Sequence, residues 1–256
     1  VALQLFGNDP LTMGEAATYL SEHTDCDIID INMGCPVNKV IKVHAGSYLM
    51  AHPEEAYDVV RAVVDHTDRP VTVKMRAGWD HDHINCVEIA RLCEKAGAKA
   101  VAVHGRTRSQ MYTGSSNNEY IKMVKESVSI PVIGNGDIKT PQDALDMMVY
   151  TKCDAVMIGR ALIGRPFLIK EIKNVLEGKE NCEVSFVERL DLCKEYARRL
   201  CKDETEYTGI REIRGIAPMY LTGMPHASHY KHALTQVTSL KDFNAIIEEY
   251  KLKVTK

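Results

Sequence analysis

The chain has 256 residues, of which 45% are hydrophobic and 26% are charged, a balance typical of a folded globular protein. Its formal net charge of −3 excludes the strongly basic composition of many nucleic-acid binders. No apolar stretch approaches the roughly 20 residues that a membrane-spanning helix needs, so we expect a cytoplasmic protein without membrane contact.

Short β-rich runs alternate with helical patterns along the first part of the chain. The patterns at 54–66, 87–98 and 141–150 are amphipathic, and Pro141 suits a first helical turn. A strand, a crossover helix and a further strand, repeated, predict a parallel sheet. The predicted strands are 1–7, 26–33, 70–78, 98–105, 131–138 and 153–159.

The spacing of these units favours a (β/α)8 barrel, which has eight strands in about 250 residues. Only six strands are visible, and Val1 already lies inside the first of them. We therefore expect that the chain lacks the first two strands of a barrel that belongs to a longer protein. An open, doubly wound sheet of six strands is the alternative.

After residue 180 the strand patterns stop and helical patterns take over. They predict a small all-helical domain over 183–256, which follows a barrel domain over 1–180. The helical domain holds 12 Lys and Arg against 11 Asp and Glu, and residues 1–182 hold 20 against 24, so the tail is only slightly the more basic part. The predicted helices are 185–201, 210–223, 227–237 and 240–253.

Eight cysteines are spread along the chain without a CxxC pair, which argues against a zinc site and against a disulfide framework. Cys35 stands out because it follows an apolar strand and lies between Gly34 and Pro36. Gly34 permits unusual backbone angles and Pro36 prevents further ladder bonding, so a tight turn is expected to present the thiol. A packed, unreactive thiol is the alternative.

Two glycine-containing loops predict a phosphate site. In a parallel barrel the chemistry lies at the carboxyl ends of the strands, and the loops after the last two strands often hold phosphate. Here these loops are 134–137, with the sequence GNGD, and 159–160, with the sequence GR. Glycine lets backbone N–H groups approach an anion closely, and Arg160 adds charge. Each loop alone is typical of a plain turn, and only the pair favours phosphate.

Three polar residues, Gln4, Lys74 and His104, interrupt the apolar strands. Such residues cost free energy when they are buried without a partner. The alternation of its strand places Lys74 inward, where a lysine needs an anionic partner such as a phosphate or an electron-rich ring. For His104 the alternative is a neutral histidine satisfied by a backbone group.

Six segments, in this order and with these gaps, closely resemble the tRNA-dihydrouridine synthases, flavoenzymes that reduce uridines in tRNA. The resemblance covers nearly the whole chain, and INMGCPV and IGNGDI are specific to that family. It implies a TIM barrel, a helical tRNA-binding domain, FMN as cofactor, NADPH as electron donor and tRNA as substrate. We also expect a monomer. The segments are VALQLFG, DIIDINMGCPVNKV, VTVKMRAGW, VAVHGRT, PVIGNGDI and DAVMIGR.

The resemblance also implies roles for single residues. Cys35 matches the general acid that protonates carbon 5 of the uracil while hydride from reduced FMN reaches carbon 6. A thiol suits this task, because its ordinary pKa near 8.5 keeps it mostly protonated at pH 7 and still able to release the proton. The positions that match FMN contacts are Gln4, Lys74, His104, Asn135, Gly136, Asp137, Gly159 and Arg160.

For the substrate RNA we expect contacts from Arg106, Arg214 and Lys231, although Arg106 could also be a solvated loop charge. The segment 214–223 lacks basic residues that are usual in the family. An acidic protein then needs a local basic stripe to attract tRNA. Because this stripe would contact RNA phosphates, the affinity for tRNA should fall steeply as the salt concentration rises. This stripe is predicted to contain Arg198, Arg199, Lys202, Arg211, Arg214 and Lys231 of the tail, with Arg106 and Arg108 at the barrel mouth.

Two other functions stay open. One is an FMN barrel that acts on a free pyrimidine, which would need no helical tail. The other is a catalytically inactive RNA-binding relic, because the segment that wraps the flavin in the family is not found before Val1 and the chain as given is expected to hold FMN poorly. The triplet His226, His229 and His232 is not expected to bind metal, since steps of three drift around a helix.

Overall fold

The structure, a computed structural model, describes residues 1–180 and 184–255. The chain divides into two compact units. The first contains Val1–Lys139 and Asp143–Ile158, and the second contains Thr140–Gln142 and Gly159–Lys256. Cys182 and the predicted domain boundary at 181–183 lie outside the described residues, and that boundary stays a prediction.

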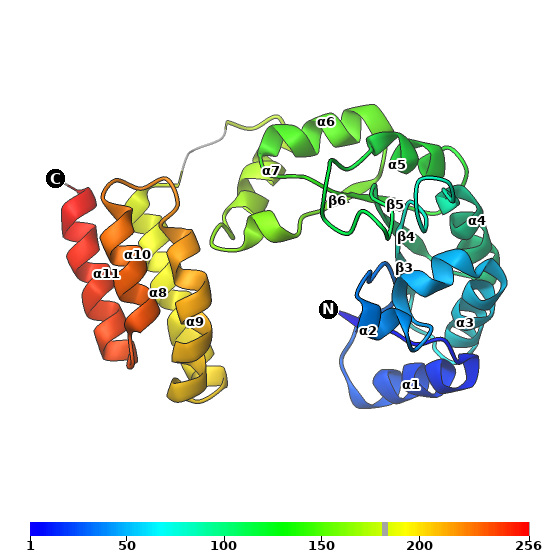
Figure 1. The fold of residues 1–256 in the computed structure, drawn as a ribbon, viewed down its shortest axis with the longest axis horizontal. Coiled ribbons are helices and arrows are strands. Elements are labelled where there is room, and N and C mark those ends of the chain that lie inside the picture. Colours follow the sequence, from blue (N-terminus) through cyan, green and yellow to red (C-terminus); the bar gives the residue numbers. More distant parts are fainter. Residues whose placement is uncertain (181–183, 256) are drawn as a thin grey trace. The chain divides into compact units, whose positions relative to one another are not determined.

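Six parallel strands form the sheet of the first unit, and their order in the sheet is their order in the chain (Figure 1). All six predicted strands are confirmed. A doubly wound sheet reverses its strand order at a switch point, and this sheet has no reversal, so its sequential order is that of barrel strands. The strands are β1 (Ala2–Leu5), β2 (Ile28–Met33), β3 (Val71–Arg76), β4 (Ala100–His104), β5 (Val132–Asn135) and β6 (Ala155–Met157).

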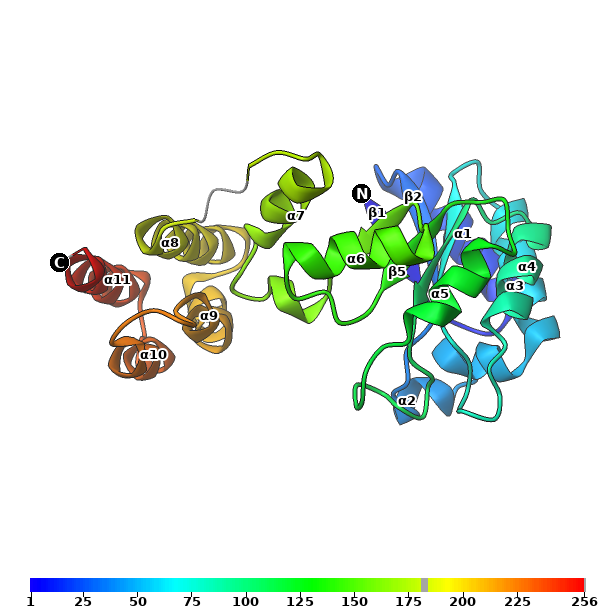
Figure 2. The same cartoon turned by 90° about the horizontal axis from the view of Figure 1, so that it is seen from above.

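Helices connect successive strands, and α1, α3, α4 and α5 lie along the same side of the sheet (Figure 2). The predictions of α3, α4 and α6 are confirmed, whereas α1 and α5 were not predicted. Two short elements, α2 and η1, follow β2. The bounds are α1 (Pro10–His23), α2 (Asn38–Ile41), η1 (Gly46–Ala51), α3 (Pro53–Asp65), α4 (Cys86–Ala96), α5 (Asn118–Lys125) and α6 (Pro141–Thr151).

The two faces of the sheet differ in polarity because side chains alternate along each strand. In β2, Ile29, Ile31 and Met33 are fully buried, while Asp30 and Asn32 between them are only partly buried. Strand pairing places Gln4 beside Asp30, Asn32 beside Lys74, and Arg76 beside His104, so these residues share the opposite face. We name this face the polar face. It consists of Gln4, Asp30, Asn32, Thr72, Lys74, Arg76, His104 and Asn135.

Helices make up the second unit in its described part. Each of the four predicted tail helices is confirmed, and the first of them begins with a capping box between Ser185 and Glu188. Large apolar side chains such as Phe243 and Ile247 fill its core. No helix in the described part of the chain is long and apolar enough to cross a membrane. The elements are η2 (Arg160–Leu162), α7 (Leu168–Leu176), α8 (Phe186–Asp203), α9 (Glu206–Tyr220), α10 (Ala227–Gln236) and α11 (Leu240–Val254).

Candidate active site

Cys35 lies in a turn directly after β2, and this turn is held from both sides. The Asn32 side-chain oxygen accepts hydrogen bonds from the backbone N–H groups of Gly34 (3.0 Å) and Cys35 (2.9 Å). Ser47 donates to the Cys35 carbonyl oxygen from its backbone N–H (3.1 Å) and from its hydroxyl (2.8 Å). A Cβ at Gly46 would lie 3.0 Å from the Cys35 Cβ, so the two segments touch. The sheet and η1 together fix the position of the Cys35 backbone.

Cys35 is a partly exposed residue, and this separates it from most cysteines that the structure describes. Burial raises the pKa of Cys86 to about 11 and the pKa values of Cys93 and Cys193 to about 12, which keeps these thiols protonated and unreactive. Cys201 is the other cysteine of the described residues that is partly exposed. Partial exposure favours a reactive Cys35 over a packed one, and its catalytic role stays a prediction.

We expect iodoacetamide at pH 8 to modify Cys35 and Cys201 well before Cys86, Cys93 and Cys193. The thiolate is the reacting form. Cys86, Cys93 and Cys193 are buried, and their raised pKa values keep them protonated at pH 8. Peptide mass spectrometry on samples quenched at successive times measures the order. Modification of Cys35 no faster than that of Cys93 would contradict the exposed turn.

Side-chain hydrogen bonds cross the first strands of the polar face and reach the Cys35 turn. Gln4 donates to Asp30 (2.6 Å) and accepts from the amide of Asn32 (2.8 Å). The Thr72 hydroxyl donates to the second oxygen of Asp30 (2.6 Å). Burial raises the pKa of Asp30, and the hydrogen bonds from Thr72 and Gln4 oppose that effect. Asn32 thus links the predicted flavin contact Gln4 to the predicted proton donor Cys35.

Lys74 lies beside Asn32 on the polar face and is partly buried. Burial lowers the pKa of Lys74 to about 8, the positive charge of Arg76 adds to the effect, and Asp30 acts against it. No carboxylate among the described residues lies within ion-pairing distance of the Lys74 ammonium group. Such a cation favours an anionic partner, and the residues present therefore fit an electron-rich, negatively charged cofactor at this face.

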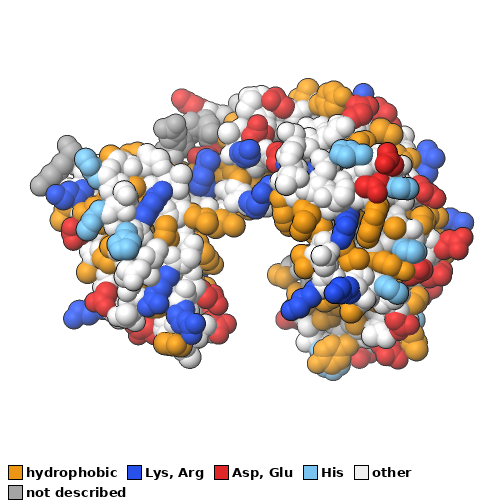
Figure 3. Space-filling view, in the orientation of Figure 1, with side chains coloured by type: hydrophobic (Ala, Val, Ile, Leu, Met, Phe, Trp, Pro, Cys, Tyr) orange, Lys and Arg blue, Asp and Glu red, His pale blue; other side chains and the backbone are white. Residues whose placement is uncertain are grey.

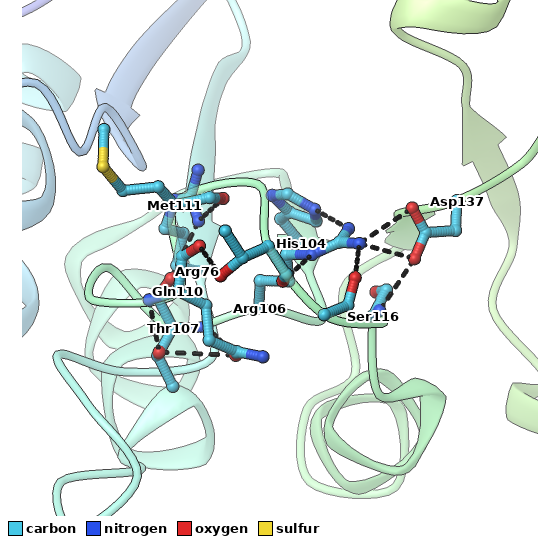
Figure 4. A network of polar contacts seen from close by, with 10 residues as sticks. Arg76, His104, Arg106, Thr107, Gln110, Met111, Ser116 and Asp137 are labelled. Atoms are coloured by element: carbon cyan, nitrogen blue, oxygen red, sulfur yellow. Dashed lines mark hydrogen bonds and ion pairs between the residues drawn. The ribbon is translucent and has the colours of Figure 1, made fainter.

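Arg106 follows β4 and lies inside the protein, with a relative exposure of 2% (Figure 4). Its Nη2 donates to both carboxylate oxygens of Asp137 (2.7 and 3.0 Å) and to the Gly114 carbonyl (2.6 Å). Its Nε donates to the Thr113 carbonyl (3.1 Å), and its Nη1 donates to the ring of His104 (3.3 Å). The alternative of a solvated loop charge is therefore wrong, because the guanidinium is enclosed by partners from other loops.

His104 is neutral. Its burial lowers the pKa to about 3, and the nearby positive charges of Lys74, Arg76 and Arg106 lower it in the same direction. Because an arginine can only donate, Nε2 of His104 accepts and the proton of the ring is on Nδ1. The neutral histidine that the sequence allowed is thus present, but its partner is a guanidinium and not a backbone group.

The predicted phosphate loop after β5 has an unusual backbone. Gly136 has a φ of 135° and Asp137 a φ of 51°, and a Cβ at Gly136 would lie 2.1 Å from the Ser116 hydroxyl oxygen. Burial acts to raise the pKa of Asp137, but hydrogen bonds from the Ser116 N–H and from Arg106 leave it lowered. The Ser116 hydroxyl is buried and has no hydrogen-bond partner among the described residues. The loop is tight at position 136, where only glycine fits.

The remaining predicted cofactor residues are placed as follows. The Asn135 side chain donates to the Met157 carbonyl (2.8 Å), which ties the end of β5 to β6. Gly159 and Arg160 are exposed and begin the second unit, at η2. The two predicted phosphate loops therefore belong to different compact units.

Arg76 is a site residue that the sequence reasoning missed. It has a relative exposure of 2%, and its Nε donates to the carbonyl of Gly34 (2.7 Å), the residue before Cys35. Its Nη1 donates to the carbonyls of Thr107 and Met111 (2.8 Å each). Arg76 therefore joins the Cys35 turn to the loop after β4, and Figure 4 shows Arg76 with Thr107 and Met111 of that loop. The same alternation that placed Lys74 inward places Arg76 two residues further on the same face.

The predicted RNA contacts of the tail differ in their surroundings. Arg214 is partly buried and donates to the Val237 carbonyl (2.6 Å), and Lys231 is also partly buried. Arg198 and Arg199 are exposed, but both pair with Glu195. Because Arg106 is buried, its place in an exposed stripe is wrong, while contacts of the other residues with RNA stay predictions.

No group of three or more His, Cys, Asp or Glu in the described chain is arranged to hold a metal ion.

Comparisons with known proteins identify the family. The family model described as "Dihydrouridine synthase (Dus)" matches residues 1–255. A tRNA-dihydrouridine synthase B of Vibrio cholerae is 41% identical over 250 residues, which are 97% of this chain and 77% of that protein. The tRNA-dihydrouridine synthase B of Shewanella oneidensis is 40% identical with the same coverage. With this match along its length, the chain belongs to the dihydrouridine synthase family.

Proposed function

We propose that this protein reduces uridines in tRNA to 5,6-dihydrouridine, with FMN at the polar face and Cys35 as the proton donor. The observation that carries the proposal is the partly exposed residue Cys35, whose backbone is fixed at the edge of the polar face in a chain of this family. When bound, reduced FMN supplies the hydride that reaches carbon 6 of the uracil.

The residues of the chain have separate tasks in this reaction. The Cys35 sulfur gives its proton to carbon 5 as negative charge develops on the ring, which completes the reduction of the double bond and leaves a thiolate that solvent reprotonates. Asn32 and Ser47 hold the turn, so the donor is positioned before substrate binds. Lys74 supplies positive charge next to an anionic flavin. The residues of the first unit that would hold FMN are Gln4, Lys74, His104, Asn135, Gly136 and Asp137, and the same role for Gly159 and Arg160 rests on the family resemblance alone.

The finer assignments rest on the family resemblance. NADPH is the electron donor, and the protein acts in the cytoplasm as a monomer. The barrel domain 1–180 carries the flavin and the helical domain 183–256 holds the tRNA. Arg214 and Lys231 contact the substrate. A comparison of flavin reduction rates with NADPH and with NADH tests the first of these assignments.

The proposal is tested by incubating the purified flavoprotein with NADPH and with tRNA transcribed in vitro, which contains no modified bases. We expect dihydrouridine in the tRNA, detected by mass spectrometry of its nucleosides. Reduction of free uracil or uridine but not of tRNA would favour the free-pyrimidine alternative. A protein that binds tRNA but neither holds flavin nor yields dihydrouridine would favour the inactive relic.

A further inference from the structure

Three aromatic rings form a continuous stack beside the Cys35 turn. The ring centroids of His44 and Tyr48 are 4.4 Å apart with planes 7° from parallel, and those of Tyr48 and His52 are 3.9 Å apart at 17°. Ser47, whose backbone and hydroxyl hold the Cys35 carbonyl, lies between the first two of these residues in the chain. The ring stack, meaning these three residues, is therefore built on the segment that positions the thiol.

The two ends of the ring stack differ. His52 is partly buried at the start of α3, and its Nδ1 lies 3.4 Å from a carboxylate oxygen of Glu55. His44 is exposed, and its ring makes no hydrogen bond with another described residue. Its backbone has a φ of 56°, in the left-handed region that is uncommon for residues other than glycine. One end is thus anchored, and the other presents a stacked imidazole to solvent.

The surroundings of the exposed end are basic. Lys39 of α2 and Lys42, which directly follows α2, are exposed, and the segment 36–52 contains no acidic residue. Two apolar side chains, Val37 and Val43, are also exposed there, at 46% and 59%. Figure 3 shows blue cationic and pale-blue histidine side chains among apolar ones on this part of the first unit. Aromatic rings interleaved with lysines are the chemistry that binds single-stranded nucleic acid, since bases stack on the rings and phosphates meet the cations.

We propose that the ring stack receives a base of the tRNA that flanks the uridine being reduced, while Lys39 and Lys42 contact the adjoining phosphates. This inference rests on the proposed function, because it assigns a binding surface next to the same thiol. Its partner is an unpaired nucleotide, whose base extends the stack beyond His44. Binding there brings the RNA chain to the segment that holds Cys35.

The test compares His44→Asn with His23→Asn. Asparagine tolerates the left-handed backbone of residue 44, so the change removes the ring without adding strain. His23 is a matched control, because it is also exposed and stacked on a tyrosine, Tyr19, with centroids 4.2 Å apart, but it lies on α1 against the other side of the sheet. His44→Phe retains an aromatic ring at the test position.

We expect His44→Asn to weaken tRNA binding and to raise KM for tRNA roughly tenfold, the scale of losing one base–ring stack, with kcat and NADPH oxidation nearly unchanged. His44→Phe should recover most of the loss, and His23→Asn should behave as the unchanged protein. Unchanged tRNA affinity in His44→Asn would overturn the inference. An equal loss of binding to heparin, which has no bases, would also overturn it, because the ring would then act by charge.

Binding and reduction are measured separately, so the two proposals fail in different ways. Anisotropy of fluorescent tRNA reports binding without any chemistry. If tRNA binds in a manner that depends on His44 but is never reduced, the proposed function fails and the binding surface stands. If NADPH oxidation falls together with tRNA binding in His44→Asn, the stack supports the Cys35 segment structurally and the inference is overturned.

Discussion

Replacement of Cys35 by alanine should slow uridine reduction by roughly two or more orders of magnitude, the usual scale for losing a general acid, while NADPH oxidation by the flavin stays nearly normal. In the proposed reaction, hydride transfer to carbon 6 leaves negative charge on the ring, and the Cys35 sulfur would supply the proton that neutralises it. The two half-reactions are followed in separate anaerobic experiments, by the flavin absorbance on mixing with NADPH and on mixing the reduced protein with tRNA.

The matched control for this variant is Cys201→Ala. Cys201 is the other partly exposed cysteine of the described chain, and it lies in α8 of the second unit. The Cys201→Ala variant should carry out both half-reactions at the rates of the unchanged protein. A Cys35→Ala protein that loses both half-reactions to the same extent would show that Cys35 supports flavin binding or folding and not proton transfer.

Replacement of Arg106 by methionine should lower the free energy of unfolding by about 2–4 kcal/mol, because it removes the charged partner of Asp137 and a buried donor to two backbone carbonyls. The change takes the guanidinium away from the Asp137 carboxylate, which keeps the hydrogen bond from the Ser116 N–H, and removes a donor from the carbonyls of Thr113 and Gly114. The Asp137 side chain is 28% exposed, so water replaces part of what is lost and the cost stays below that of a fully buried pair.

Urea denaturation of Arg106→Met, followed by circular dichroism, measures this loss. Arg91→Met is the control, because Arg91 is exposed on α4 and makes a single long hydrogen bond of 3.4 Å to the Ser127 carbonyl. Its effect should remain within about 0.5 kcal/mol, as for most surface substitutions. Equal stabilities of the two variants would mean that the buried guanidinium contributes nothing net to folding.

The strands and the polar face were largely predictable, because they rest on the period of two along each strand. Lys74 and His104 were found because each interrupts an apolar run. Arg76 was missed because it ends its strand, where a charged residue attracts no notice, although alternation assigns it to the same face. The helix α1 was missed because its buried positions include the small residues Gly14 and Ala17, which weaken its apolar pattern.

The surroundings of Arg106 could not be predicted from the residues near it. Its ion-pair partner, Asp137, follows a different strand and is 31 positions away in the chain. Only the fold brings the ends of β4 and β5 side by side. From the sequence pattern alone, an arginine after a strand can as well be solvated as buried with a partner. The same reason applies to Ser47, which reaches the Cys35 carbonyl from a segment 12 residues later.

The position of His104 among buried cations limits how the polar face responds to acid. An ordinary histidine gains a positive charge as the pH falls through about 6.5. With its pKa lowered to about 3, His104 gains none between pH 7 and pH 5, and over that range its ring keeps an unprotonated Nε2 for Arg106. A loss of activity between pH 7 and pH 5 would therefore have to arise from a group other than His104.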